Sequence, residues 1–177
     1  QEQNEDGSFY YYSKENMAVR HIPKTIDNHH TSYMLSNLVH ILESDFPTEE
    51  EKNSLVLACQ KGMGFSLCHL FDETTGVAKY MVDAPHRKAE AVTYSEAIVA
   101  MCAFLRSPYI RDELKERLHR ILPKVMGHLL SLISLRDGSV PCENVFGIWT
   151  RMDSIRWGNG PALQAIFDYY STTGEGF

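Results

Sequence analysis

The stretch TIDNHHTSYMLSNLVHIL, residues 25–42, begins with polar residues and continues with apolar residues at a regular spacing, here called the apolar stripe. Behind Thr31 and Ser32 the stripe is made of Met34, Leu35, Leu38, Ile41 and Leu42. Apolar side chains three or four positions apart share one face of an α-helix. The stretch therefore predicts an amphipathic helix, preceded by an acid and two histidines that form either its cap or a site.

Four further segments have the same helical spacing. One begins at Pro47, with acids in its first turn, and runs to about Leu70. The others are expected at 92–106, at 107–133 with a kink at Pro123, and at 160–171. Strand patterns are short and sparse. The sequence therefore predicts an all-α protein.

Turn-forming motifs recur between the helices. An acid and a glycine precede a hydrophobic or aromatic stretch in Asp6-Gly7-Ser8-Phe9, Asp72-Glu73-Thr74-Thr75-Gly76 and Asp137-Gly138-Ser139-Val140. A helix begins about twenty residues after each turn, which gives a period of about 65 residues. We therefore expect residues 1–177 to form one domain of helical-hairpin repeats, which stack because a single pair cannot bury its apolar face.

The repeat pattern starts and stops partway through a unit. The first turn has no helix before it, and residues 171–177 stand where the next helix of a continuing array would begin. We expect a fragment or terminal part of a larger array. Exposed helix faces would then drive self-association or packing with the missing helical units.

Composition excludes several partners. The formal net charge of −6, with no local Lys/Arg cluster, argues against nucleic acid. No apolar run approaches the ~18–20 residues needed for membrane insertion. The four cysteines have no CxxC or zinc-like spacing, so we expect reduced thiols, no metal or other cofactor, and a cytoplasmic location.

Two stretches carry a resemblance to known families. Asp6–Tyr11 with Ile26–Tyr33 is similar to bacterial α/α-toroid proteins of polysaccharide biosynthesis, often described as prenyltransferase-like or squalene-oxidase-like repeats. Arg156–Ala165 resembles an inner-helix start in the helical domain of glucuronyl epimerases. The resemblance implies part of an α/α toroid whose inner helix starts line a cavity. The chain lacks the Asp-x-Asp-Asp cluster of class II terpene cyclases and the zinc triad of protein prenyltransferases, which makes a terpenoid cyclase a distant third reading.

The first helix entry contains Asp27, His29 and His30. Imidazoles at a cavity mouth can bind sugar hydroxyls or exchange protons near neutral pH. A metal would need further ligands, and adjacent histidines at a helix start point in different directions. The alternative is that Asp27 or Asn28 only caps the helix while one histidine packs between helices.

The last entry contains Asp153, Arg156, Trp157 and Asn159. A guanidinium fork pairs with a carboxylate, and an indole stacks on a pyranose ring, which suits a sugar acid. The alternative is a loop salt bridge between Asp153 and Arg156 beside a buried Trp157.

The middle entry contains Tyr94 and Glu96, and an aromatic run that includes Tyr11 precedes the first helix. Glu96 either serves the site or complements the helix dipole. The aromatic run either stacks on carbohydrate or packs the loop over helix ends. If the repeats curve as in a toroid, the three entries converge on one cavity.

We therefore predict a protein that acts on or binds a uronic-acid-containing polysaccharide or oligosaccharide. As an enzyme it would be an epimerase, lyase or glycoside hydrolase. The expected catalytic residues are His29, His30 and Glu96. The expected substrate-binding residues are Tyr11, Asp27, Tyr94, Asp153, Arg156, Trp157 and Asn159. The alternative is a non-catalytic helical-repeat scaffold for a protein or glycan.

Overall fold

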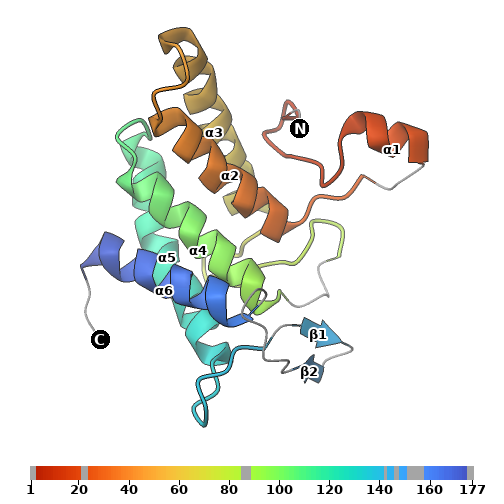
Figure 1. Cartoon of the computed structure of the whole chain (residues 1–177), viewed down its shortest axis with the longest axis vertical. Coiled ribbons are helices and arrows are strands. Elements are labelled where there is room, and N and C mark those ends of the chain that lie inside the picture. Colours follow the sequence, from red (N-terminus) through yellow and green to blue (C-terminus); the bar gives the residue numbers. More distant parts are fainter. Residues whose placement is uncertain are drawn as a thin grey trace.

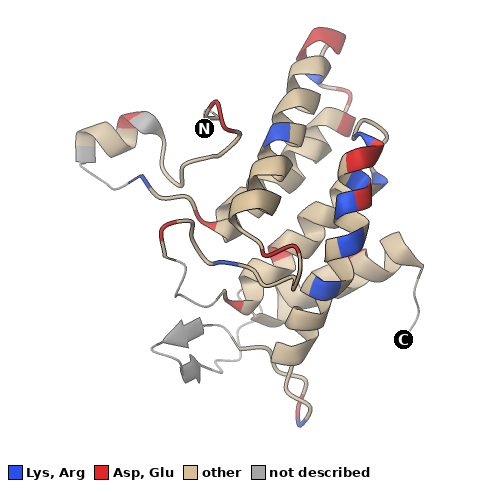
Figure 2. Ribbon diagram, turned by 180° about the vertical axis from the view of Figure 1, so that it is seen from behind, with Lys and Arg blue, Asp and Glu red and all other residues tan. Residues whose placement is uncertain are grey.

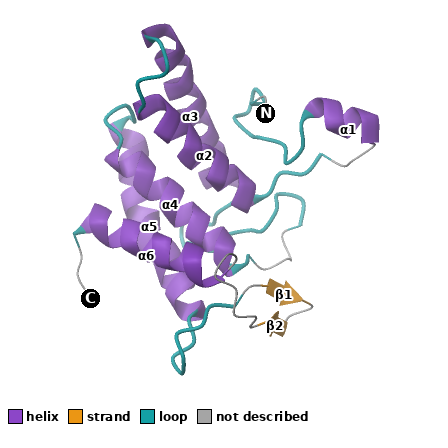
Figure 3. Ribbon diagram, viewed as in Figure 1, coloured by secondary structure: helices purple, strands orange, loops and turns teal. Residues whose placement is uncertain are grey.

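The computed structural model describes residues 3–20, 24–84, 89–141, 143–145, 148–150 and 158–174. These residues form six helices: α1 (Lys14–Arg20), α2 (Asn28–Glu43), α3 (Glu49–His69), α4 (Ala91–Arg106), α5 (Asp112–Leu132) and α6 (Gly160–Thr173). Two short strands, β1 (Glu143–Val145) and β2 (Ile148–Thr150), pair antiparallel with Val145 opposite Ile148. Figure 3 shows how far helix dominates. The predicted helical class is confirmed, and the small hairpin was not predicted.

Helix α4 lies at the centre of the bundle. It packs against α2, α5 and α6, and α2 packs also against α3. In Figure 1, α2, α4 and α6 run in one direction and begin on the same side of the molecule, while α3 and α5 return. The largest fully buried side chains come from these helices and include Leu35, Ile98, Met101, Phe104, Leu118 and Leu122. One hydrophobic core therefore joins the helices from α2 to α6.

The helix starts follow local capping chemistry. Asp27 caps α2, because its carboxylate accepts a hydrogen bond from the His30 backbone N–H at 2.8 Å. Helix α2 therefore begins at Asn28. Thr48 caps α3 in a capping box with Glu51, so α3 begins at Glu49, two residues after the expected Pro47.

The helices also differ from the sequence prediction between α4 and α5 and near the N-terminus. Residues 107–111 are not helical, because Ser107 ends α4 by donating its N–H to Ala103 O, and α5 begins only at Asp112. Helix α1, at residues 14–20, was not predicted, since seven residues are too few for a clear apolar period.

The buried face of α2 is rotated from the predicted stripe. Leu35 and Leu42 are fully buried, but Ile41 is 48% exposed. Polar Ser32 and Ser36 are buried in its place. The prediction for Ile41 was wrong because α2 is covered by α3 on one side and by α4 on another, which buries a second, polar edge of the helix.

Each of the three predicted turns is closed by two backbone hydrogen bonds, and the second and third turns have the same spacing. In the second turn Gly76 N donates to Asp72 O at 2.7 Å, and Asp72 N donates to Val77 O at 3.0 Å. The third turn repeats both bonds between Ser134 and its partners 138 and 139, at 2.8 and 2.9 Å. The first is one residue tighter, with Gly7 N donating to Asn4 O and Asn4 N to Ser8 O.

Each turn places a glycine in the left-handed region. The φ angles are 94° at Gly7, 78° at Gly76 and 69° at Gly138. Side chains are disfavoured at such angles, which accounts for the recurrent glycine. The aspartates of the Asp-Gly-Ser motifs add local bonds, since Asp6 and Asp137 each accept from the N–H and hydroxyl of the serine two residues on.

Candidate functional site

The start of α2 is held against the linker that leads to α4. Asn28 N donates to Tyr80 O at 3.0 Å, and Val82 N donates to Ile26 O at 3.1 Å. The buried Asn28 amide also donates to the carbonyls of Leu70 and Lys79, at 3.0 and 3.2 Å. These bonds give the first turn of α2 a fixed position.

Asp27 orients His30 within this turn. Oδ1 of Asp27 lies 2.9 Å from Nδ1 of His30. A carboxylate only accepts hydrogen bonds, so Nδ1 carries the proton and Nε2 of the neutral ring is the basic atom. The Asp27 side chain is almost buried, whereas the His30 side chain is 45% exposed. The arrangement presents an oriented imidazole to solvent.

Aromatic rings surround His30. The Tyr11 ring meets it edge-on, with centroids 4.2 Å apart and an interplanar angle of 84°. His29 makes a similar contact at 4.7 Å. The Tyr11 N–H donates to Thr25 O at 2.8 Å, which ties the aromatic loop to the segment before α2. Tyr11, His29 and His30 therefore form one cluster, partly open to solvent.

Glu96 of α4 lies within electrostatic reach of this cluster. Burial raises the pKa of the Glu96 carboxyl, and a positive charge on His30 works in the opposite direction. A half-buried carboxyl that keeps its proton to higher pH can serve as an acid beside a basic imidazole. The structure thus places two of the predicted site residues, Glu96 and His30, within electrostatic reach of each other.

His29 joins the starts of α2 and α4. Burial lowers the pKa of its imidazole, as does the neighbouring His30, while Asp27 and a hydrogen bond with the Val92 backbone raise it. The dominant effect of burial favours the neutral ring. His29 therefore packs between helices, the alternative that the sequence left open for one of the two histidines.

Tyr94 lies apart from the cluster. Its side chain is only 7% exposed, its hydroxyl accepts from Ala78 N at 3.4 Å, and its ring stacks on His128 of α5 at 5.6 Å. Tyr94 supports the loop after the second turn. The structure gives this hydroxyl and ring partners within the protein.

The last entry is described in part. Oδ1 of Asn159 accepts from Val140 N at 3.0 Å, which anchors the third turn at the start of α6. Asp153, Arg156 and Trp157 lie outside the described residues. Their predicted roles stay predictions.

The sequence reasoning missed the pairing of Asp27 with His30. A signal was present, because an acid at the N-cap and a polar residue three positions later are spaced as in a capping box. It also missed the contact between residues 26–28 and 80–82, which joins segments far apart in the chain. No local sequence pattern predicts a pairing between such distant segments.

Charge is unevenly distributed over the fold. Figure 2 shows Lys and Arg gathered along α5 and acids at the tip between α2 and α3. Within the described part of the chain, no helix is long and apolar enough to cross a membrane. Among the same residues, no three His, Cys, Asp or Glu side chains are grouped to hold a metal ion.

Comparison of the chain with known protein families, with curated proteins and with solved structures found no match.

Proposed function

We propose that the chain is part of an α/α toroid built from hairpin units of about 65 residues, and that it binds a uronic-acid-containing polysaccharide. The matching hydrogen bonds of the second and third turns support the repeat. The common direction of α2, α4 and α6 supports an inner layer whose helix starts face one side (Figure 1). The glycan would lie across those starts.

The observation that carries the proposal is the pairing of an oriented imidazole with a carboxyl of raised pKa. His30 offers Nε2 as a base, since Asp27 holds Nδ1. Glu96 offers a proton, because burial raises its pKa. Tyr11 adds an aromatic ring beside the imidazole, and the face of such a ring suits the apolar face of a sugar.

This pair fits the chemistry of a uronate. The carboxyl group of the sugar acidifies the proton on the neighbouring ring carbon, which a positioned base can remove. Return of a proton to the opposite face of that carbon inverts its configuration, and loss of the adjacent glycosidic oxygen, protonated by an acid, cleaves the chain. Epimerase and lyase chemistry therefore need the same two groups. Arg156 and Trp157 are proposed to bind the carboxylate and stack on the ring.

Calorimetric titration with a defined oligouronate, and with a neutral oligosaccharide of equal length, tests the proposal. We expect the oligouronate to bind more tightly, and His30→Ala to weaken it roughly five- to tenfold, the scale of one hydrogen bond. His40→Ala is the matched control, because His40 is exposed near the far end of α2. Equal binding of both sugars, or equal effects of both variants, would reject the glycan site.

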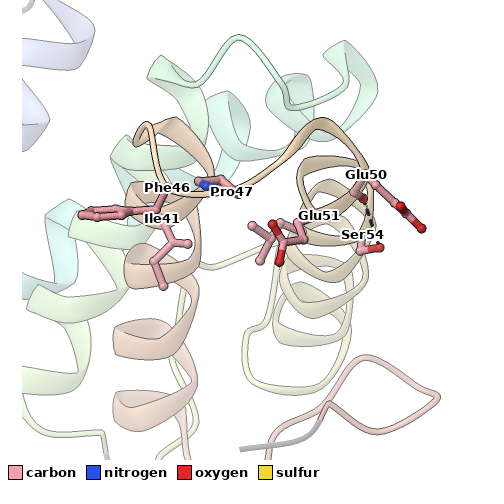
Figure 4. Close-up of a pocket in the computed structure, with 7 residues that line it drawn as sticks. Ile41, Phe46, Pro47, Glu50, Glu51 and Ser54 are labelled. Carbon is pink, nitrogen blue, oxygen red and sulfur yellow. Dashed lines mark hydrogen bonds between the residues drawn. The ribbon is translucent and has the colours of Figure 1, made fainter.

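A second candidate is a scaffold without catalysis, favoured by an apolar groove at the tip between α2 and α3. Figure 4 shows this groove, with a volume of about 510 Å³. It is lined by Ile41, Phe46, Pro47, Glu50, Glu51, Ser54 and Leu55. Phe46 is 92% exposed, so the groove presents a large apolar side chain to a partner. A Phe46→Asp variant that loses a cellular partner kept by His30→Ala would support this reading.

Self-association or packing with further helical units belongs to the same proposal, as does a cytoplasmic location. Apolar side chains exposed on α6 support the first, and the free thiols of Cys59, Cys68 and Cys102 support the second. Light scattering over a wide concentration range tests the association. A monomer at every concentration would leave only packing with other helical units.

A further inference from the structure

The third turn, residues 134–139, projects from the fold as an ordered knob. It keeps its shape because Ser134 N donates to Ser139 O at 2.9 Å and Gly138 N donates to Ser134 O at 2.8 Å. A Cβ added at Gly138 would have no described residue within 4 Å, so no helix in the described part of the chain covers this side of the turn. The Leu135 side chain is fully exposed. The knob therefore presents an apolar side chain to solvent.

A cation stands beside this leucine. Arg136 follows Leu135 and is exposed as well. The Asp137 carboxylate is bonded within the knob, where it accepts hydrogen bonds from the backbone N–H and the hydroxyl of Ser139, at 3.0 and 2.7 Å. The knob therefore offers an apolar and a positively charged side chain, side by side, to a partner.

The groove at the tip between α2 and α3 has the complementary chemistry. Its apolar lining comes from Ile41, Phe46, Pro47 and Leu55 (Figure 4). Five exposed acids surround it: Glu43, Asp45, Glu49, Glu50 and Glu51. Lys52 is the only base among residues 41–55, and it is paired with Glu49 at 2.8 Å. The groove can therefore receive an apolar side chain that has a cation next to it.

The knob and the groove lie at opposite ends of the molecule. Figure 1 has the longest axis vertical, with the tip between α2 and α3 at the top and the turn after α5 at the bottom. The view from behind in Figure 2 shows the same two ends. A knob therefore cannot reach the groove of its own chain, whereas it can reach the groove of another copy.

We propose that the occupant of the groove is the knob of a second copy of this chain. Leu135 enters beside Ile41 of α2 and Leu55 of α3, and Arg136 lies at the acidic rim, where it pairs with Glu50. Because the two surfaces differ and lie at opposite ends, the contact repeats from copy to copy and builds an open head-to-tail assembly. This inference rests on the self-association proposed above and names its surfaces; it does not depend on what the start of α2 binds.

Light scattering on the full chain tests the assembly with two variants. Leu135→Asp removes the knob and keeps the groove, whereas Phe46→Asp spoils the groove and keeps the knob. A contact of this size belongs to the weak, transient class, so we expect the original chain to grow beyond a dimer as its concentration rises. Each variant alone should stay a monomer.

A mixture of the two variants gives the sharper result. Only one intact knob and one intact groove remain in each pair of chains, so the mixture should form a one-to-one dimer and nothing larger. Dimer formation would also show that both variants are folded.

The charged contact is tested separately. Arg136→Glu should weaken the assembly roughly tenfold or more, because it places a like charge among the acids of the groove. Adding Glu50→Lys to the same chain should recover part of that loss, since the pair is restored with its signs exchanged. An Arg136→Glu chain that assembles as well as the original would overturn the inference.

Leu163→Asp is the matched control, because Leu163 is a leucine 69% exposed on α6, outside both surfaces. It should assemble as the original chain does. Loss of assembly in Leu163→Asp would place the contact on α6, which overturns this inference and leaves self-association standing. A mixture of the knob and groove variants that stays monomeric, or an original chain that is a monomer at every concentration, overturns it too.

Discussion

Nδ1 of His30 lies 2.9 Å from Oδ1 of Asp27, the same oxygen that caps the helix carrying His30. One carboxylate therefore serves both the stability of α2 and the orientation of the imidazole. The two roles can be separated by substitution. The helix cap needs only an oxygen acceptor, whereas the imidazole interacts with the negative charge of the carboxylate.

Asp27→Asn keeps the oxygen acceptor and removes the charge, whereas Asp27→Ala removes both. Asn caps helices about as well as Asp, so we expect its free energy of unfolding to stay within roughly 0.5 kcal/mol of the original. Ala should lose about 1–2 kcal/mol, because it leaves the N-terminal N–H groups of α2 without their acceptor. Urea unfolding followed by circular dichroism measures both.

Thr48→Ala is the control for that experiment. It removes the cap of α3, about 1 kcal/mol, without touching the His30 cluster. Equal losses for Asn and Ala at position 27 would mean that the charge, and not the cap, stabilises the turn.

Glu96 gives stability a pH dependence of known sign. Burial raises the pKa of its carboxyl above the usual 4.5, so the folded state binds a proton that the unfolded state releases. Its contribution is fully present below pH 4.5 and is lost as pH rises through the raised pKa. Glu96→Gln should therefore be more stable than the original chain at pH 7.

The advantage of Glu96→Gln should shrink as the pH falls towards 4.5, because both side chains are then neutral. Unfolding curves between pH 4 and 7 measure it, with Glu50→Gln in the exposed first turn of α3 as the control. A Glu96→Gln chain less stable at pH 7 than at pH 4, relative to the original, would contradict the burial argument.

The cysteines should differ sharply in reactivity. Burial raises the pKa of the Cys59 thiol to about 12 and that of Cys102 to about 11, which leaves little of the reactive thiolate. Cys68 is exposed. Iodoacetamide at pH 8 should therefore label Cys68 in the folded protein before the other two.

Peptide mass spectrometry after timed labelling follows each thiol, and labelling in urea supplies the control in which the three react alike. Fast labelling of Cys59 without denaturant would show that α3 opens locally more often than its buried position implies.

The helices were predictable because their apolar spacing is local, whereas the faces they bury are not. Ile41 continues the stripe of Leu35 and Leu42, yet it is half exposed, since the positions of α3 and α4 decide which edge is covered. Ser107 and Pro108 look like a helix start, but Ser107 ends α4. A capping residue between two helices can end the first or begin the second, and its residue type alone does not tell which.

The candidate site was likewise predictable only where its contacts are local. The Asp27 cap and its partner His30 lie within one turn, so spacing alone could have paired them. Tyr94 and Glu96 are two residues apart on α4, and such positions point roughly 200° apart around a helix. Both could not face one cavity. Glu96 interacts with His30. The Tyr94 side chain instead contacts Ala78, just after the second turn, and His128 of α5.

Gly76→Ala and Gly138→Ala should differ, although both glycines have a left-handed φ. Any side chain costs about 1–2 kcal/mol in that conformation, and this is the whole expected loss at Gly138, where nothing in the described part of the chain stands in the way. At Gly76 the new Cβ would also strike Lys124 of α5, adding roughly 1–3 kcal/mol. Chemical unfolding of the two variants measures the difference directly. Equal losses would mean that α5 yields to the added carbon, and that the contact between the second turn and α5 is looser than the geometry indicates.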